Sequence, residues 1–430
     1  MKVGIISLGC AKNLVDSETI AYLFKDNNVD IVNEVEQADI ILINTCGFID
    51  ASKQESIDTI FEMLKYNKIL VVAGCLVERY KEELQKEIPE VDLFVAIKDY
   101  PHFSELLNEV LKNKHFKGTI SNNKRILSTL PFTAYLKISE GCNNCCTYCA
   151  IPLIRGKFRS FPQEELVLQA RELASKGVKE LVVISQDTTR YGEDLQNTNI
   201  VSLLKELLKI EEFVYIRLLY LYPDEISDDL IELIGNNPRL TPYFDIPIQH
   251  ASSSVLQRMN RRGDEKFLRN LFEKIRIKVP NAILRTTLIV GFAGETEADF
   301  EILKQFVKDI RFDHLGTFTY SQEEGTIGNT LPNQIEEDIK EKRYQEIMKL
   351  QQQISLENNQ KRIGRKSFGL IVGFSQEKSA YLVRSEFNAP DEIDGSIYCY
   401  GEEEYQLGDK IFFEIVDADI YDLYGKIITL

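Results

Sequence analysis

Three cysteines stand close together in the sequence, at Cys142, Cys146 and Cys149. Their C-x3-C-x2-C spacing puts three thiols on one short loop, which can hold three irons of a 4Fe–4S cube and leave the fourth iron open. S-adenosylmethionine can occupy that open position, and an electron from the cluster then splits it into a 5′-deoxyadenosyl radical. The spacing, with Tyr148 just before the last cysteine, therefore predicts an iron–sulfur cluster with one open iron.

A zinc knuckle and a structural disulfide are the alternative interpretations of these thiols. Zinc usually takes a fourth Cys or His ligand nearby, and the next histidine along the chain is His250. The residues from Met1 to Ser7 lack the apolar core of a signal peptide, and no apolar run is long enough to span a membrane. Eight cysteines without an export signal favour metal ligation in a reducing cytoplasm. Cys145, one residue off the spacing, is predicted to be a bystander.

Three further cysteines, Cys10, Cys46 and Cys75, each follow a short apolar run that is predicted to be a strand. The runs are Val3–Ser7, Ile40–Asn44 and Ile69–Ala73. Helical patterns between them predict a parallel sheet, and the carboxyl ends of its strands meet at one edge. Glycines beside all three cysteines let the backbone approach a bulky ligand. The pattern predicts a second cluster with three protein ligands, against the alternative of buried cysteines that act as small hydrophobic residues.

The central part of the chain alternates between strand and helix about six times, which predicts an incomplete barrel with its site at the carboxyl ends of the strands. The predicted strands are Ala134–Ser139, Glu180–Ser185, Tyr215–Leu218, Tyr243–Ile246, Leu284–Val290 and Leu315–Phe318. Four residues after these strands are candidates for S-adenosylmethionine contacts, although each alone is more often a capping or packing residue. They are Gln186, Gln249, Gly291 and Glu295.

His250 is either a proton carrier or a hydrogen-bonded structural histidine. The charged helix at 336–359 is predicted to be a solvated linker.

The last part of the chain changes to five short alternating runs, which predict a small β-barrel. The runs are Phe368–Val372, Ala380–Val383, Ser396–Cys399, Lys410–Val416 and Gly425–Thr429. Small barrels often bind RNA, but residues 364–430 carry six Lys and Arg against thirteen Asp and Glu, a net charge of −7. The whole chain has a net charge of −16. Because phosphate contacts need clustered cations, a nucleic-acid partner is not expected, and a basic protein surface fits better.

Taken together, these features resemble the radical-SAM methylthiotransferase family over essentially the whole chain. The motifs that carry the resemblance are the two cysteine sets and the stretches Ser7–Glu18, Ile151–Gly156, Gln186–Thr189, Asp245–Ala251 and Ala389–Gly395. One departure is Ala293, where the family usually has proline. The resemblance implies an α/β chain: an N-terminal parallel α/β domain (1–125), an incomplete (β/α)6 radical-SAM barrel (128–360) and a small all-β C-terminal TRAM barrel (364–430).

The resemblance also implies a division of labour between two 4Fe–4S clusters. The barrel cysteines hold the cluster that cleaves S-adenosylmethionine, and the N-terminal cysteines hold an auxiliary cluster that carries the sulfur to be inserted. One S-adenosylmethionine methylates that sulfur and a second supplies the radical. The radical takes hydrogen from an unactivated C–H bond, so no catalytic residue beyond the cluster ligands is expected.

The flanking motifs resemble most the branch of the family that modifies an aspartate of ribosomal protein S-twelve, a basic protein expected as the partner. The alternatives are the branch that modifies adenosine in transfer RNA and a non-catalytic iron–sulfur scaffold. The resemblance further implies an electron donor such as flavodoxin or ferredoxin and a cytoplasmic location. The sulfur donor is left open.

Overall fold

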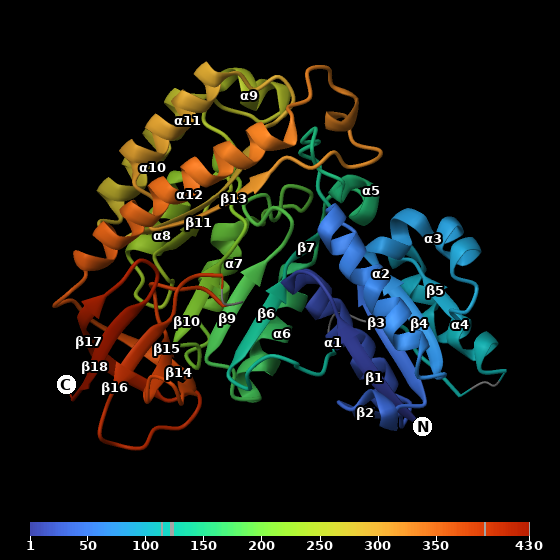
Figure 1. Ribbon diagram of the computed structural model, residues 1–430. Coiled ribbons are helices and arrows are strands. Elements are labelled where there is room, and N and C mark those ends of the chain that lie inside the picture. Colours follow the sequence, from blue (N-terminus) through green and yellow to red (C-terminus); the bar gives the residue numbers. More distant parts are fainter. Residues whose placement is uncertain (113–114, 121–123, 391–392, 430) are drawn as a thin grey trace.

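The computed structural model describes residues 1–112, 115–120, 124–390 and 393–429. The polar stretch at 121–123, near the predicted end of the first domain, and Asp391 and Glu392 lie outside the described residues. Figure 1 shows an N-terminal α/β layer on one side of a central arc of strands, with a small β-barrel on the other side. Within the described ranges, no helix is both long and apolar enough to cross a membrane.

The N-terminal part is a five-stranded parallel sheet, as predicted. Its strands lie in the order β2-β1-β3-β4-β5, and β3 is buried at every position, as expected for a central parallel strand covered by helices. The strands are β1 (Lys2–Ser7), β2 (Asp30–Val32), β3 (Ile40–Thr45), β4 (Ile69–Gly74) and β5 (Leu93–Val95). The helices are α1 (Ala11–Asp26), α2 (Asp50–Leu64), α3 (Cys75–Glu87) and α4 (Phe103–Val110).

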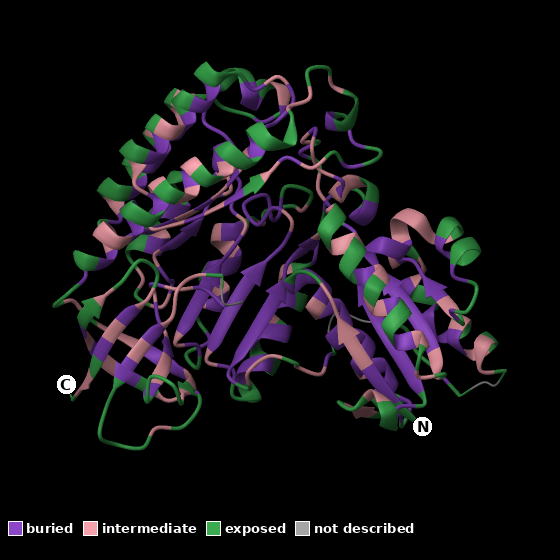
Figure 2. Cartoon of the chain, viewed as in Figure 1, coloured by how far each residue is buried: buried purple, intermediate pink, exposed green. Residues whose placement is uncertain are grey.

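The central part confirms the predicted incomplete barrel. Two parallel three-stranded sheets, β6-β9-β10 and β11-β12-β13, are joined by a bridge between Ile216 and Leu240. The strands are β6 (Thr133–Lys137), β9 (Glu180–Ile184), β10 (Tyr215–Leu218), β11 (Tyr243–Asp245), β12 (Ile283–Val290) and β13 (His314–Thr319). Helices cover the outside, while the inner strands β6, β9 and β10 are buried along their length (Figure 2). The helices are α6 (Gln163–Ser175), α7 (Ile200–Leu207), α8 (Asp228–Gly235), α9 (Ser253–Arg258), α10 (Glu265–Lys278) and α11 (Glu297–Ile310).

The charged helix α12 (Glu337–Gln360) is not a solvated linker, which corrects the prediction made from its charge run. Lys340 and Arg343 are buried on its inner face, where Lys340 Nζ donates to the Tyr320 carbonyl at 2.9 Å. Arg343 Nη1 lies 3.1 Å from Glu295 Oε1. The stems of long cationic side chains can cover apolar surface while their heads find buried acceptors. The helix therefore closes one flank of the incomplete barrel.

The C-terminal part is a closed five-stranded barrel, as predicted, with the order β14-β15-β16-β18-β17. The strands are β14 (Lys366–Ser375), β15 (Ala380–Arg384), β16 (Ile397–Tyr400), β17 (Lys410–Ala418) and β18 (Leu423–Ile428). It contacts the first residues of the central strands, where Arg384 pairs with Glu180 at 2.9 Å and the Tyr215 hydroxyl donates to the Phe368 carbonyl at 2.8 Å. The predicted domain boundaries stay predictions, although each sheet lies within its predicted range.

Candidate functional site

The three N-terminal cysteines follow the carboxyl ends of β1, β3 and β4, which pair in parallel at neighbouring positions. A Cβ atom added to Gly9 would lie 2.9 Å from Cys46 Sγ, so only glycine lets the first two loops approach this closely. Burial raises the pKa of Cys75 to about 12. The Arg155 cation opposes this rise, whereas the nearby thiols of Cys10 and Cys46 add to it. Cys10 is the exposed member, whereas Cys46 and Cys75 are buried. The fold therefore brings the three predicted thiols together.

The other three thiols lie on the loop between β7 (Ser139–Glu140) and α5 (Ile151–Arg155). Backbone N–H groups of Asn144 and Ile151 lie 3.5 Å from Cys142 Sγ and Cys149 Sγ. Burial raises the pKa of Cys142 to about 11 and raises that of Cys149 too, so a cation must replace the thiol protons if thiolates are to form here.

Cys146 Sγ has two polar neighbours, the Tyr222 hydroxyl at 3.7 Å and Arg261 Nη1 at 3.9 Å. Hydrogen bonds to the sulfurs help to set the reduction potential of an iron–sulfur cluster, so these neighbours fit a cluster on this loop. In the described ranges, no three His, Cys, Asp or Glu side chains are spaced to hold a single metal ion. A 4Fe–4S cube does not need that spacing, because each thiol binds a different iron. Cys145 is exposed and has a left-handed backbone with φ of +52°.

A buried group of four charges joins the two cysteine sets, and we call it the interdomain charge cluster: Asp16, Lys137, Glu140 and Arg155. Arg155 Nη1 lies 2.6 Å from Asp16 Oδ2, and Lys137 Nζ lies 2.9 Å from Glu140 Oε2. Arg155 Nη2 also donates to Cys75 Sγ at 3.3 Å. The barrel cysteine loop therefore ends in a helix whose arginine touches a thiol of the N-terminal set.

The interdomain charge cluster was not predicted from the sequence. Asp16 and Arg155 do lie within motifs that carried the family resemblance, but they stand 139 residues apart. Nothing local in the sequence shows that they meet. A charged residue within an otherwise apolar stretch, as at Ile151–Arg155, was the available signal.

A cavity of about 500 Å³ opens beside Cys10 and is walled by all three parts of the chain. Its walls include Cys10, Tyr220, Asp245, Arg285, Thr287 and Ile393. Tyr220, just after β10, has a left-handed backbone with φ of +63°, and Gln249 has φ of +69°. Such strain costs about 1–3 kcal/mol per residue and is concentrated at functional sites. This cavity is therefore the candidate site for substrate.

The four candidate contacts for S-adenosylmethionine occupy different environments. Gln186 Nε2 donates to Glu140 Oε1 at 2.8 Å, while its Oε1 is buried without a hydrogen-bond partner among the described residues. Gln249 pairs in a bridge with Leu288 beside the barrel interior. Glu295 is buried, and its Oε2 accepts the N–H groups of Gly291 at 2.5 Å and Phe292 at 3.0 Å. Glu295 thus stabilises the Gly291 turn from behind.

Gly291 itself has φ of +73°, and a Cβ there would lie 2.2 Å from Lys340 Cγ. The close packing of α12 therefore explains why glycine stands at this position.

His250 is fully buried, and the Ser252 N–H donates to its Nδ1 at 3.0 Å. Its Nε2 lies 3.9 Å from Glu295 Oε2. Burial lowers the pKa of His250 to about 3, so the ring is neutral near pH 7. The geometry favours the structural interpretation of this histidine over a proton carrier.

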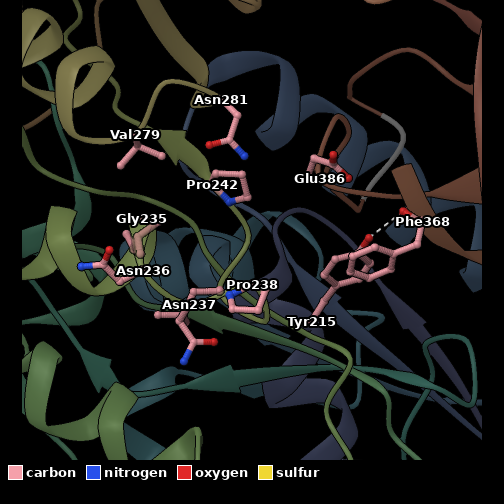
Figure 3. A pocket seen from close by; sticks show the side chains of 12 residues that line it. Tyr215, Gly235, Asn236, Asn237, Pro238, Pro242, Val279, Asn281, Phe368 and Glu386 are labelled. Carbon is pink, nitrogen blue, oxygen red and sulfur yellow. Dashed lines mark hydrogen bonds between the residues drawn. The ribbon is translucent and has the colours of Figure 1, made fainter. Parts of the chain in front are cut away.

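A second cavity, of about 280 Å³, lies where the central strands begin, away from the cysteines (Figure 3). Tyr215 stacks on Phe368 there with ring centroids 5.0 Å apart. No cysteine lines this cavity, so it holds none of the predicted chemistry.

Comparisons with known proteins match all three parts of the chain. Family models described as Uncharacterized protein family UPF0004, Radical SAM superfamily and TRAM domain match residues 2–96, 136–307 and 363–428. Among solved structures, the radical S-adenosylmethionine methyltransferase TsrM from Kitasatospora setae has a TM-score of 0.55 at 11% identity, over 74% of this chain and 72% of that one. The cobalamin-dependent radical enzyme OxsB has a TM-score of 0.52 at 14% identity, over 81% and 56%. At these identities the likeness shows the fold alone.

The fold and the matched regions define a radical-SAM enzyme with an extra N-terminal cysteine domain and a TRAM barrel. Curated relatives named Ribosomal protein uS12 methylthiotransferase RimO match it at full length. Those of Acetivibrio thermocellus and Alkaliphilus oremlandii are 46% and 47% identical, over 100% of this chain and 98% and 99% of theirs. That of Aquifex aeolicus is 47% identical over 99% and 97%. The chain belongs to the RimO family of radical-SAM methylthiotransferases, whose chemistry uses S-adenosylmethionine and iron–sulfur.

The buried neutral His250 predicts a pH dependence of stability. Its folded pKa of about 3 lies below the ordinary value of 6.5, so the unfolded chain binds a proton that the folded chain does not. As the pH is lowered below about 6.5, the contribution of His250 should therefore reduce the free energy of unfolding by about 1.4 kcal/mol per pH unit. His250→Gln, which keeps an acceptor for the Ser252 N–H, should flatten this fall. Urea unfolding of the cluster-free protein at several pH values measures it, and identical slopes in both proteins would contradict the assignment.

Proposed function

We propose that this enzyme inserts a methylthio group at the β-carbon of an aspartate in ribosomal protein uS12. The observation that carries the proposal is the cavity beside Cys10, which joins this thiol to the strand ends of the barrel. Full-length relatives that are named for uS12 support the choice of substrate. With a ribosomal substrate, we also propose that the enzyme acts in the cytoplasm.

Two 4Fe–4S clusters fit the six thiols, and each cluster would keep one iron free of protein ligands. We assign one to Cys10, Cys46 and Cys75 and the other to Cys142, Cys146 and Cys149. When bound, the barrel cluster with S-adenosylmethionine would supply a carbon radical, and the N-terminal cluster would supply the sulfur. Arg155 touches Cys75 Sγ and closes the interdomain charge cluster, so it keeps the two sets in fixed register.

The chain's own residues bind and orient the cofactor and shield the reaction. Gln186, with an unpartnered buried Oε1 next to the cysteine loop, is a direct contact for S-adenosylmethionine in this proposal, and so is Gln249 at the barrel interior. Gly291 and Glu295 would support it indirectly by shaping the turn after β12. Cys46 and Cys75 are buried, which limits the access of water to that part of the site and would protect a radical from side reactions.

The acidic C-terminal barrel supports a basic protein over tRNA as the substrate. Glu402, Glu403 and Glu404 are exposed together on the loop between β16 and β17. Such a field repels phosphates and steers a basic protein inward. The electron donor would be a flavodoxin or ferredoxin type of protein. The tRNA-modifying branch is the second candidate, and the product test below separates the two.

Product analysis tests the substrate. Anaerobically reconstituted and reduced enzyme should add a methylthio group to purified uS12 when S-adenosylmethionine is present, because the cavity admits a protein side chain beside Cys10. Mass spectrometry of uS12 and of nucleosides from bulk tRNA in the same reaction measures the two products. Modified adenosine with unmodified uS12 would contradict the substrate, and failure to cleave S-adenosylmethionine at all would indicate a non-catalytic scaffold.

Iron content tests the assignment of two clusters. The reconstituted chain should bind about eight irons, four for each cube. The triple variant Cys142→Ala/Cys146→Ala/Cys149→Ala should bind half of this and lose cleavage of S-adenosylmethionine. The triple variant Cys10→Ala/Cys46→Ala/Cys75→Ala should also bind half but should still form 5′-deoxyadenosine.

Cys145→Ser is the matched control for these variants, because it removes a thiol from the same loop without touching the spacing. It should keep all the iron. Full iron content in either triple variant would contradict the two-cluster assignment, and lost iron in Cys145→Ser would show that the wrong neighbour of Cys146 was excluded.

A further inference from the structure

The cavity beside Cys10 is lined by one cation, Arg285, and by one carboxylate, Asp245, in a chain with a net charge of −16. Arg285 and Thr287 of β12 line the cavity. Leu284 before them and Leu288 after them are buried in the core, and Thr286 between them is buried too. This alternation follows from the period of two along a strand. An arginine in the middle of a barrel strand therefore points into the same space as Cys10.

Asp245 holds Arg285 by one edge only. Arg285 Nη1 lies 2.7 Å from Asp245 Oδ1, and the second oxygen of Asp245 accepts the Tyr220 N–H at 2.9 Å. Arg285 Nε lies 3.7 Å from Asp394 Oδ1 of the C-terminal barrel. Among the residues with described contacts, none accepts a hydrogen bond from Arg285 Nη2. A guanidinium fixed in this way can present its remaining edge to a second carboxylate.

Lys12 is a second cation near this cavity, behind one of its lining residues. It follows Cys10 by two residues on α1, is 8% exposed, and its Nζ lies 3.2 Å from the centroid of the Tyr220 ring, which lines the cavity. Within the described part of the chain no carboxylate lies within 4.0 Å of this ammonium group. Its neighbours inside the chain are Tyr220, the Cys10 thiol and, more weakly, Asp245. The ammonium group can still interact with a carboxylate that enters the cavity beside Tyr220.

We propose that Arg285 and Lys12 bind the side-chain carboxylate of the substrate aspartate. The inference rests on the proposed function and specifies how its substrate is recognised. In aspartate the carboxylate is bonded directly to the β-carbon, so two cations that fix the carboxylate also fix the carbon that loses hydrogen. The same contacts select aspartate over asparagine, because a neutral amide leaves both cations without a counter-charge.

Affinity for two forms of the substrate tests the proposal. One form is uS12, and the other carries asparagine in place of the target aspartate. Reconstituted wild-type enzyme should bind the aspartate form at least about tenfold more tightly, the size expected for charge-assisted hydrogen bonds. In Lys12→Met and in Arg285→Gln this preference should fall toward one, and Arg285→Lys should restore part of it.

Lys304→Met is the matched control, because it removes one positive charge from a surface pair with Glu301 and Glu346 on the outside of the barrel. It should keep the preference. Iron content and thermal unfolding of each variant are measured alongside, so that a folding defect is recognised and Arg285→Lys replaces Arg285→Gln where needed.

Several outcomes would overturn the proposal. Equal wild-type affinity for the two forms would do so, as would variants that keep the full preference. Loss of iron in Lys12→Met with an unchanged preference would make Lys12 a counter-charge for the N-terminal cluster instead. These results leave the proposed function standing if wild-type enzyme methylthiolates uS12, whereas absence of any uS12 binding or modification would remove both proposals.

Discussion

The interdomain charge cluster is the contact on which the rest of the architecture depends. Asp16 comes from the first helix of the N-terminal domain, and its partners Lys137 and Arg155 come from the barrel, at 2.5 and 2.6 Å. Two cations and two carboxylates lie together in this group. Burial alone would raise the pKa of Glu140, but Lys137 and Arg155 outweigh this effect and lower it to about 2. Removal of one partner from such a group leaves an uncompensated buried charge, which is costly. The intact group adds little net stability, and its main effect is to specify one docking geometry. That geometry sets how the two cysteine sets face each other.

Two further ion-pair groups hold the N-terminal domain at its margins. Glu18 pairs with Arg125 on one side, and Glu323 of the barrel pairs with Lys53 and Arg79 on the other. The C-terminal barrel is fastened at the opposite end through Glu180, while Asp394 reaches Tyr243 and His314 near the cavity. The cavity beside Cys10 therefore exists only when all three parts are docked. Docking of the three parts therefore brings Cys10 to the strand ends of the barrel.

Much of the fold follows from local signals in the sequence. The strands that end in Cys10, Cys46 and Cys75, the six strands of the barrel and the five of the C-terminal barrel were all predicted close to their observed bounds, because long apolar or alternating runs fix them. The strands β2 and β5 were missed because three residues carry too little periodicity. The inner face of α12 was missed because a charge run does not show which cations find buried acceptors.

The candidate site was predictable only where residues act through spacing. Three cysteines on one loop, and three at equivalent strand ends, can be recognised without coordinates. By contrast, Arg155, Lys12 and Arg285 gain their meaning from partners far along the chain, such as Asp16 and Tyr220, and those contacts are set by domain docking. The left-handed turn at Tyr220 that places its ring under Lys12 is likewise a tertiary feature.

The central claim of the proposed function is that the two cysteine sets serve one reaction at a single substrate carbon. The most direct test uses uS12 deuterated at the β-carbon of its target aspartate, with reduced enzyme and unlabelled S-adenosylmethionine. The account predicts that deuterium is transferred to 5′-deoxyadenosine in step with methylthiolation of uS12. Methylthiolated uS12 that keeps all its deuterium, together with unlabelled 5′-deoxyadenosine, would contradict it.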